Sequence, residues 1–268
     1  MCKLKAVSRL VVKFGTESLS GENGRLSQKI FNDFARQIIA VQQFGIGVAI
    51  VSSGAIRAGA ERMDELRLET VHMEKKQIAG IGARHLMNEW GRAFEIYGKE
   101  VAQIWVTYAS LAHNGERKST KDSTICYLEN GVIPIINEND VLSDEEIRWM
   151  DEGISENDNL AWRIATLVEA DAVLFITSVK GIYKEDSQES LKAEIYEEID
   201  CEAGLEFLDN GHNSTGGSGG IKTKLKAAFQ CAQAGKKVAV AGKDEDIIIK
   251  FVKGFPVGTK IKNPDRVC

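Results

Sequence analysis

Short runs of apolar residues alternate along the chain with longer segments in which apolar positions recur at a helical spacing. The short runs are typical of buried strands, and the longer segments are typical of amphipathic helices. The runs predict strands at 9–14, 47–54, 101–106, 172–177 and 236–241, with a further strand within 131–140. The periodic segments predict helices at 27–45, 75–98, 157–170 and 222–235. Because the strands are apolar on both faces and alternate with helices, we expect an α/β fold with a mainly parallel sheet that helices cover on each side.

Local signals refine two of the helices and one loop. The helix at 27–45 has Ser27 as its expected N-cap and Gly45 as its expected stop. Glycines at positions 80, 82 and 91 interrupt the helix at 75–98 and weaken that prediction. The segment 141–153 is expected to form a hairpin or another excursion from the sheet. The chain shows no internal repeat and no proline-rich linker, so we expect one domain.

The segments that follow the predicted strands are small, polar or rich in glycine. In parallel α/β sheets, ligands bind outside the carboxyl ends of the strands. The segments at this edge are Lys13–Thr16, Ser52–Ala55, Asn137–Asp140 and Thr177–Ser178. A lysine at the end of a buried strand is costly unless an anion meets it. The pattern therefore predicts an anion-binding site at this edge.

Composition and charge exclude several classes of function. The 268 residues carry a net charge of -5, which argues against a general electrostatic grip on nucleic acid, although a local basic pocket remains compatible with it. The five cysteines are scattered and form no CxxC pair, so we interpret them as reduced thiols of a cytosolic protein. The first ten residues contain no long apolar stretch, so we expect no signal peptide, and no apolar run in the sequence approaches about 20 residues. We expect a cytoplasmic protein without membrane contact, and, because the histidines lack ligand spacing, without a metal site.

The segment 214–228, STGGSGGIKTKLKAA, runs from a glycine-rich loop directly into a helix. Glycines let backbone N–H groups converge on an anion, and the helix N-terminus adds partial positive charge. Phosphate binding is therefore favoured over a flexible surface loop. The loop is not a Walker A motif, because Ile221 stands where that motif requires glycine.

Other polar motifs leave two interpretations open. The turn SSGAI (52–56) suits either a site for a substrate carboxylate or a tight strand-to-helix turn capped by serine. INEND (136–140) and SENDN (155–159) suit either structural turns and caps or a pair of segments that donate amide hydrogen bonds to a substrate and accept from its ammonium group.

Taken together and in order, the motifs VVKFGTES, VSSGAI, IPIINEND, ENDNLAW and GGIKTKLKAA resemble the glutamate 5-kinases of the amino acid kinase superfamily. The resemblance spans roughly residues 9 to 262. It implies a three-layer α/β/α sandwich around a mainly parallel, roughly eight-stranded sheet. It also implies ATP-dependent phosphorylation of the γ-carboxylate of L-glutamate, the first step of proline biosynthesis, with Mg²⁺ accompanying the nucleotide.

The resemblance carries further expectations about organisation. An amino-acid-binding lobe would span about 1–170 and a nucleotide-binding lobe about 171–262, within a single domain of residues 1–268. Family members are commonly homo-oligomers (dimers or tetramers), are inhibited by proline, and pass their product to glutamyl-phosphate reductase. Many carry a C-terminal PUA domain, which we expect to be absent here because the chain stops soon after FPVGTKIKNPDRVC.

The resemblance also implies roles for individual residues. The catalytic positions are Lys13, Lys224 and Asp158, where the aspartate orients the two lysines. The substrate-binding positions are Ser53, Gly54, Ala55, Asp140 and Asn157. The ATP-binding positions are Lys13, Gly15, Thr177, Ser178, Ser218, Gly219, Gly220, Ile221, Lys222, Thr223 and Lys224.

Two alternatives remain beside this interpretation. One is a kinase of the same superfamily that acts on another small carboxylic acid, which SSGAI and INEND argue against. The other is a non-catalytic, amino-acid-sensing domain. It is motivated by Ser178 and Glu156, which differ from the residues usual in the family.

Overall fold

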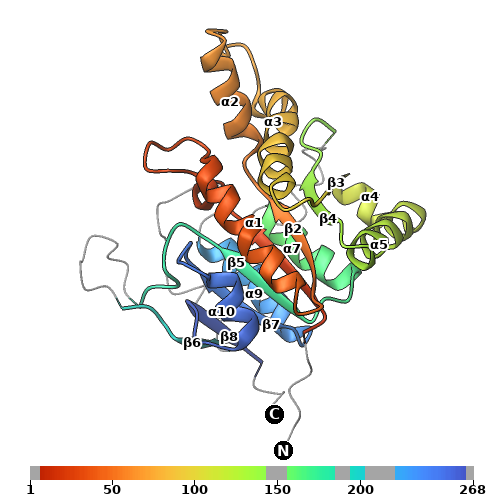
Figure 1. Ribbon diagram of the computed structural model, residues 1–268, viewed down its shortest axis with the longest axis vertical. Helices are drawn as coiled ribbons and strands as arrows, with labels where there is room; N and C mark the ends of the chain where they lie inside the picture. The colour runs from red at the N-terminus through yellow and green to blue at the C-terminus, as the bar shows by residue number, and fades with distance from the viewer. Residues whose placement is uncertain (1–6, 143–155, 185–193, 203–220, 264–268) are drawn as a thin grey trace, which may run out of the picture.

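The computed structural model describes residues 7–142, 156–184, 194–202 and 221–263, and Figure 1 shows their arrangement. In these residues one sheet of eight strands has the order β3-β4-β2-β1-β5-β7-β8-β6. Neighbouring strands are parallel except β7 and β8, which are antiparallel. The strands are β1 (Arg9–Phe14), β2 (Gly47–Ser52), β3 (Val101–Val106), β4 (Ile133–Glu138), β5 (Ala172–Ile176), β6 (Glu198–Asp200), β7 (Lys237–Ala241) and β8 (Thr259–Lys262).

Helices cover both faces of the sheet. They are α1 (Gln28–Gln42), α2 (Ala55–Glu65), α3 (Lys75–Glu95), α4 (Tyr108–Ala112), α5 (Asn114–Glu129), α7 (Glu156–Leu167), α9 (Ile221–Gln233) and α10 (Ile247–Lys253). On one face Phe34 of α1, Trp90 of α3 and Phe251 of α10 belong to one buried apolar cluster. On the other, Leu160 of α7 and Phe229 of α9 belong to a second. The expected three-layer sandwich with a mainly parallel sheet is therefore confirmed.

The alternation of side chains along β1 divides its residues between the two layers, because successive residues of a strand point to opposite faces. Leu10, Val12 and Phe14 lie in the cluster that contains α1 and α3. Val11 lies in the cluster that contains α7 and α9. Lys13, two residues after Val11, therefore points toward the α7 layer.

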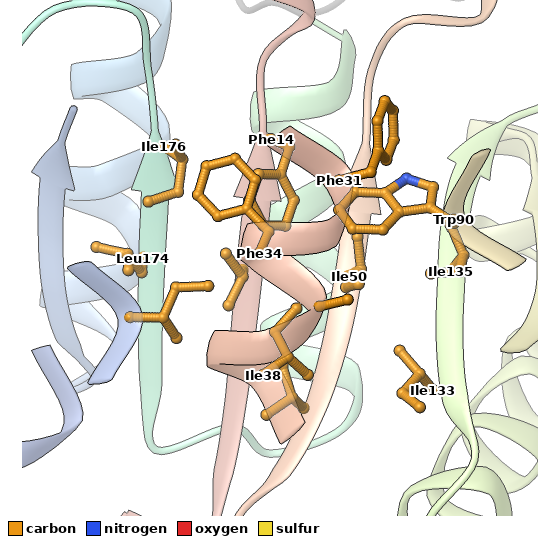
Figure 2. Close-up of a cluster of buried hydrophobic side chains, with 14 of the residues drawn as sticks. Phe14, Phe31, Phe34, Ile38, Ile50, Trp90, Ile133, Ile135, Leu174 and Ile176 are labelled. Carbon is orange, nitrogen blue, oxygen red and sulfur yellow. The ribbon is translucent and has the colours of Figure 1, made fainter. Parts of the chain in front are cut away.

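Aromatic rings fill the α1–α3 side near the end of β1, as Figure 2 shows. The Phe14 ring centroid lies 4.6 Å from that of Phe34 and 5.1 Å from that of Trp90. Trp90 also meets Phe31 edge-on at 4.7 Å and stacks on Phe94 at 6.0 Å. These fully buried rings hold α3 against the sheet where β1 ends.

The helix α3 continues through its glycines, and Gly82 lies where α3 crosses α2. A Cβ on Gly82 would lie 1.8 Å from the carbonyl oxygen of Ala55, and one on Gly59 would lie 2.0 Å from that of Ile78. Only glycine allows the backbones of α2 and α3 to approach this closely.

The predicted strands and helices are all present, whereas several further elements were not predicted. These are α4, α5, α10, β6 and the antiparallel β8. The expected excursion at 141–153 lies, beyond residue 142, outside the described residues, as does the glycine-rich loop up to Gly220. Ser27 occupies the N-cap of α1, although its side chain makes no capping hydrogen bond there. No described helix is long and apolar enough to cross a membrane.

Candidate active site

The carboxyl ends of β4, β2, β1 and β5 lie next to one another, because these strands are consecutive neighbours in the sheet. Lys13 pairs in register with Val51 on one side and with Phe175 on the other. It therefore sits near the middle of the edge at which the sequence predicts a binding site.

Two lysines converge on one carboxylate at this edge. Lys13 Nζ lies 2.5 Å from Asp158 Oδ1, and Lys224 Nζ lies 3.4 Å from Asp158 Oδ2. Asp158 is fully buried, and Lys13 is only 2% exposed. Asp158 stands in the first turn of α7, where the helix dipole favours a negative charge. The three residues come from β1, α7 and α9, which are far apart in the sequence.

Burial makes the charge on Lys13 expensive. The pKa of Lys13 is lowered from 10.5 to about 8, mainly because burial disfavours the ammonium form. Asp158 raises this pKa, whereas the nearby positive charge of Lys224 lowers it. Two cations thus share one carboxylate, and an additional anion next to them would stabilise the charged form of both lysines.

The turn after β2 leaves backbone N–H groups without a described acceptor at the start of α2. The N–H of Ser53 donates to the carbonyl oxygen of Phe14 over 3.0 Å. Gly54 has a φ of 116°, a left-handed conformation that favours glycine. Among the described residues, the N–H groups of Gly54 and Ala55 donate to no acceptor, as is usual at a helix N-terminus.

The amide and acid segments also lie near this edge. Asp140 follows β4 and is partly exposed, and Asn157 stands one residue before Asp158 in the first turn of α7. Asn157 Oδ1 is buried and accepts no hydrogen bond from the described residues. An unpaired buried acceptor costs about 1–3 kcal/mol, so a ligand that donates to this amide would be favoured.

The sequence-predicted nucleotide positions are described only in part. The N–H of Gly15 donates to the carbonyl oxygen of Ile176 over 3.2 Å, and the N–H of Thr177 donates to that of Ala241 over 2.9 Å. Gly15 has a φ of -77°, which any residue adopts, and a Cβ there would meet its nearest described atom, the carbonyl oxygen of Ile176, at 3.6 Å. Thr177 is buried and Ser178 is exposed.

The nucleotide loop itself lies outside the described residues at Ser218, Gly219 and Gly220. The helix α9 begins at Ile221, so Lys222, Thr223 and Lys224 occupy its first turn. The side chains of Ile221 and Lys222 are not described, whereas Thr223 is half-buried. The expected helix that carries Lys224 is present.

The described residues contain no group of three histidine, cysteine, aspartate or glutamate side chains that would hold a metal ion. The site is built instead from two cations, a shared acid and free backbone N–H groups. Such a set binds anions and neutralises negative charge that develops during a reaction.

Comparison with known proteins first defines the class. Residues 8–242 match the model of the amino acid kinase family. A UMP kinase from Bacillus anthracis superposes with a TM-score of 0.64 at 17% sequence identity, over 97% of this chain and 98% of the kinase; this likeness concerns the fold. Since the family match covers most of the chain, the protein belongs to the amino acid kinase family.

Two relatives narrow the class further. The glutamate 5-kinase of Shewanella halifaxensis is 36% identical over 254 residues, which are 94% of this chain and 67% of the relative. The glutamate 5-kinase of Dehalococcoides mccartyi is also 36% identical over 254 residues, which are 94% of this chain and 68% of the relative. The chain thus stands in the glutamate 5-kinase branch of the family, which the motifs indicated.

Proposed function

We propose that this protein transfers the γ-phosphoryl group of ATP to the γ-carboxylate of L-glutamate and forms L-glutamyl 5-phosphate, the first step of proline biosynthesis. The single observation that carries the chemistry is the pair of lysines, Lys13 and Lys224, that meet the buried Asp158 at the carboxyl edge of the sheet. The choice of glutamate as substrate is supported by the relatives named glutamate 5-kinase, which are 36% identical to the chain.

In the proposed reaction, a γ-carboxylate oxygen of glutamate attacks the γ-phosphorus of ATP in line. An O–P bond forms while the bond from phosphorus to the β,γ-bridging oxygen breaks, and ADP leaves with the electron pair. The nucleophile is already an anion, so no strong general base is required. The main barrier is the repulsion between carboxylate and phosphate, and catalysis consists of positioning and charge neutralisation.

Each cation has a separate part in this proposal. Lys13, fixed at the end of β1, contacts the transferring phosphoryl group, and Lys224 neutralises charge on the leaving side. Asp158 holds both ammonium groups in place, which the flexible stem of a lysine does not ensure by itself. The pKa of Lys13, about 8, leaves its ammonium form dominant at neutral pH.

Substrates are proposed to bind on either side of these lysines. The N–H groups of Gly54 and Ala55, the Ser53 hydroxyl, Asp140 and Asn157 hold glutamate. Residues up to about 170 form the amino-acid lobe, and about 171–262 form the nucleotide lobe. Thr177, Ser178 and the segment Ser218–Lys224 hold the nucleotide.

Mg²⁺ fits this site as a companion of ATP. The carboxylate of Asp158 is engaged by two lysines, and the described residues offer no three-ligand cage. Mg²⁺ is commonly bound through substrate phosphates and water with few protein ligands. When bound, it supplies further neutralisation of the phosphate charge, while Lys13 and Lys224 hold the phosphates.

The family resemblance adds proposals about context. Glutamyl 5-phosphate is a labile acyl phosphate, so it would be passed to a glutamyl-phosphate reductase. Proline would act as a feedback inhibitor, and the enzyme would work in the cytoplasm as a homo-oligomer.

The test is ADP release with L-glutamate, L-aspartate and N-acetyl-L-glutamate as separate acceptors, with Mg²⁺ or with EDTA. Hydroxylamine in a parallel reaction traps an acyl phosphate as its hydroxamate. We expect Mg²⁺-dependent ADP release and hydroxamate with glutamate only, and less of both with proline. Turnover with another acid would establish a different substrate. Binding of glutamate without ADP release would establish a sensing domain instead.

A further inference from the structure

A buried side-chain relay connects helix α3 to the turn that we assign to glutamate. The indole N–H of Trp90 donates to the hydroxyl of Ser52 over 3.0 Å. The hydroxyl of Ser52 donates to the carbonyl oxygen of Ser53 over 3.0 Å. Trp90 and Ser52 are both fully buried, so neither contacts a substrate directly.

The direction of this relay is fixed by chemistry. An indole N–H donates and never accepts, so the Ser52 oxygen is the acceptor of that bond. The single proton of the Ser52 hydroxyl is then available for the Ser53 carbonyl. Water does not compete at these buried positions, and each broken bond would leave a buried polar group unpaired.

The relay determines how the Ser53–Gly54 peptide is oriented. This peptide bond is trans, as are all those described, and a peptide unit is planar. Fixing the carbonyl oxygen of Ser53 on one side therefore fixes the N–H of Gly54 on the opposite side. The N–H of Ser53 is held by the carbonyl oxygen of Phe14, so the turn is fastened at two points.

The aromatic cluster holds the donor in place. The Trp90 ring centroid lies 5.1 Å from that of Phe14 and 4.7 Å from that of Phe31. Figure 2 shows these three rings gathered in the buried cluster. The indole cannot rotate without displacing these rings. Phe14 is in register with Ser52 in the neighbouring strand, so the cluster and the turn share one rigid part of the sheet.

We propose that Trp90 and Ser52 are positioning residues for the reaction, which orient the N–H group of Gly54 toward a carboxylate of the substrate. This proposal rests on the proposed function. In this proposal the relay controls the affinity for the amino acid and has little effect on the affinity for ATP.

The experiment compares Trp90→Phe, Ser52→Ala and the double variant with the wild-type enzyme in ADP release. Loss of one buried hydrogen bond corresponds to a roughly three- to tenfold change in binding. We expect each single variant to raise the KM for glutamate by about that factor, with a smaller fall in kcat and an unchanged KM for ATP. Because the two residues form one chain, the double variant should resemble Ser52→Ala alone.

A matched control is Phe251→Leu, since Phe251 of α10 is buried in the same apolar cluster and its ring meets Lys237, whereas no described ring contact joins it to Trp90. It should lower the thermal midpoint and leave the KM for glutamate unchanged. The proposal is overturned if Trp90→Phe and Ser52→Ala keep the wild-type KM for glutamate, or if Phe251→Leu raises it equally.

Amide hydrogen exchange separates failure of this proposal from failure of the proposed function. If the wild-type enzyme does not phosphorylate glutamate, the proposed function fails. The relay is then tested by hydrogen exchange in the absence of substrate. The relay predicts faster exchange of the Ser53 N–H in Trp90→Phe and Ser52→Ala than in Phe251→Leu. Equal exchange in all three variants would overturn it.

Discussion

Replacement of Asp158 by asparagine tests the electrostatic core of the site most directly. The substitution keeps the shape of the side chain and removes the negative charge that lies between Lys13 and Lys224. Asp158 is what raises the pKa of Lys13, whereas burial and Lys224 lower it. Without the carboxylate, the pKa of Lys13 should fall below its present value of about 8.

The size of the effect follows from burial. Removal of one partner from a buried ion pair typically costs about 3–5 kcal/mol, because it leaves an uncompensated charge. Lys13 is 2% exposed, so in the Asp158→Asn variant it should avoid this cost by losing its proton at neutral pH. A lost charge contact at a reacting group typically lowers kcat by about 10²–10³, and we expect a loss of that size for Asp158→Asn at pH 7.5.

The assay is kcat for ADP release between about pH 5.5 and 9, measured at saturating ATP and glutamate. Activity of Asp158→Asn should increase toward acidic pH, because protons restore the charge on Lys13. The control is Asp122→Asn, which breaks an exposed ion pair with Lys118 at 2.7 Å and should change little. A kcat for Asp158→Asn within about threefold of the wild type, or a pH profile of unchanged position, would refute the reasoning.

Three further predictions concern the same elements. Lys13→Ala should lower kcat by about 10²–10³ with little change in the KM for glutamate, and Lys13→Arg should also be poor, because a planar guanidinium does not replace a compact charge; steady-state kinetics that give a near-normal kcat would contradict the assignment. In the wild-type enzyme, kcat/KM for ATP should fall as the pH rises through about 8, since the ammonium form of Lys13 is lost above its lowered pKa, whereas a profile flat to pH 10 would argue against this role. Gly82→Ala should lower stability by about 3 kcal/mol, because the new Cβ would lie 1.8 Å from the Ala55 carbonyl oxygen. Gly91→Ala, in which the new Cβ would have its nearest contact at 3.9 Å, should be neutral or stabilising. Thermal melts of the two variants beside the wild type measure both effects.

The parts of the fold that sequence predicts are those with a strong local signal. The strand 9–14 and the helix 27–45 have clear hydrophobic patterns, and both are present as β1 and α1. The alternation in β1 also implies the face to which Lys13 points. The convergence of Lys13 and Lys224 on Asp158 could be expected only from resemblance to a family, because the three residues come from separate elements.

The elements that escaped prediction have weak or misleading local patterns. The helix α5 (Asn114–Glu129) is largely polar, and only Thr124 and Leu128 are buried in it. The strand β6 has three residues, too few for a periodic pattern. The helix α3 is predicted and present; its glycines lower its helix propensity and weaken that prediction, whereas the crossing with α2 requires Gly82. In each case a tertiary contact outweighs the local preference.

The two faces of the sheet are expected to separate two kinds of control over the proposed reaction. Lys13 is in register with Val51, and the next residues, Phe14 and Ser52, are in register with each other. Because side chains alternate, Lys13 points to the α7 layer with Asp158, whereas Ser52 points to the α3 layer with Trp90. Substitutions beneath α7 should therefore act mainly on kcat through charge, and substitutions beneath α3 mainly on the KM for glutamate through orientation of the turn. A kinetic survey of buried positions in β1 and β2 would test this division, and variants of both faces that alter kcat and KM in the same proportion would contradict it.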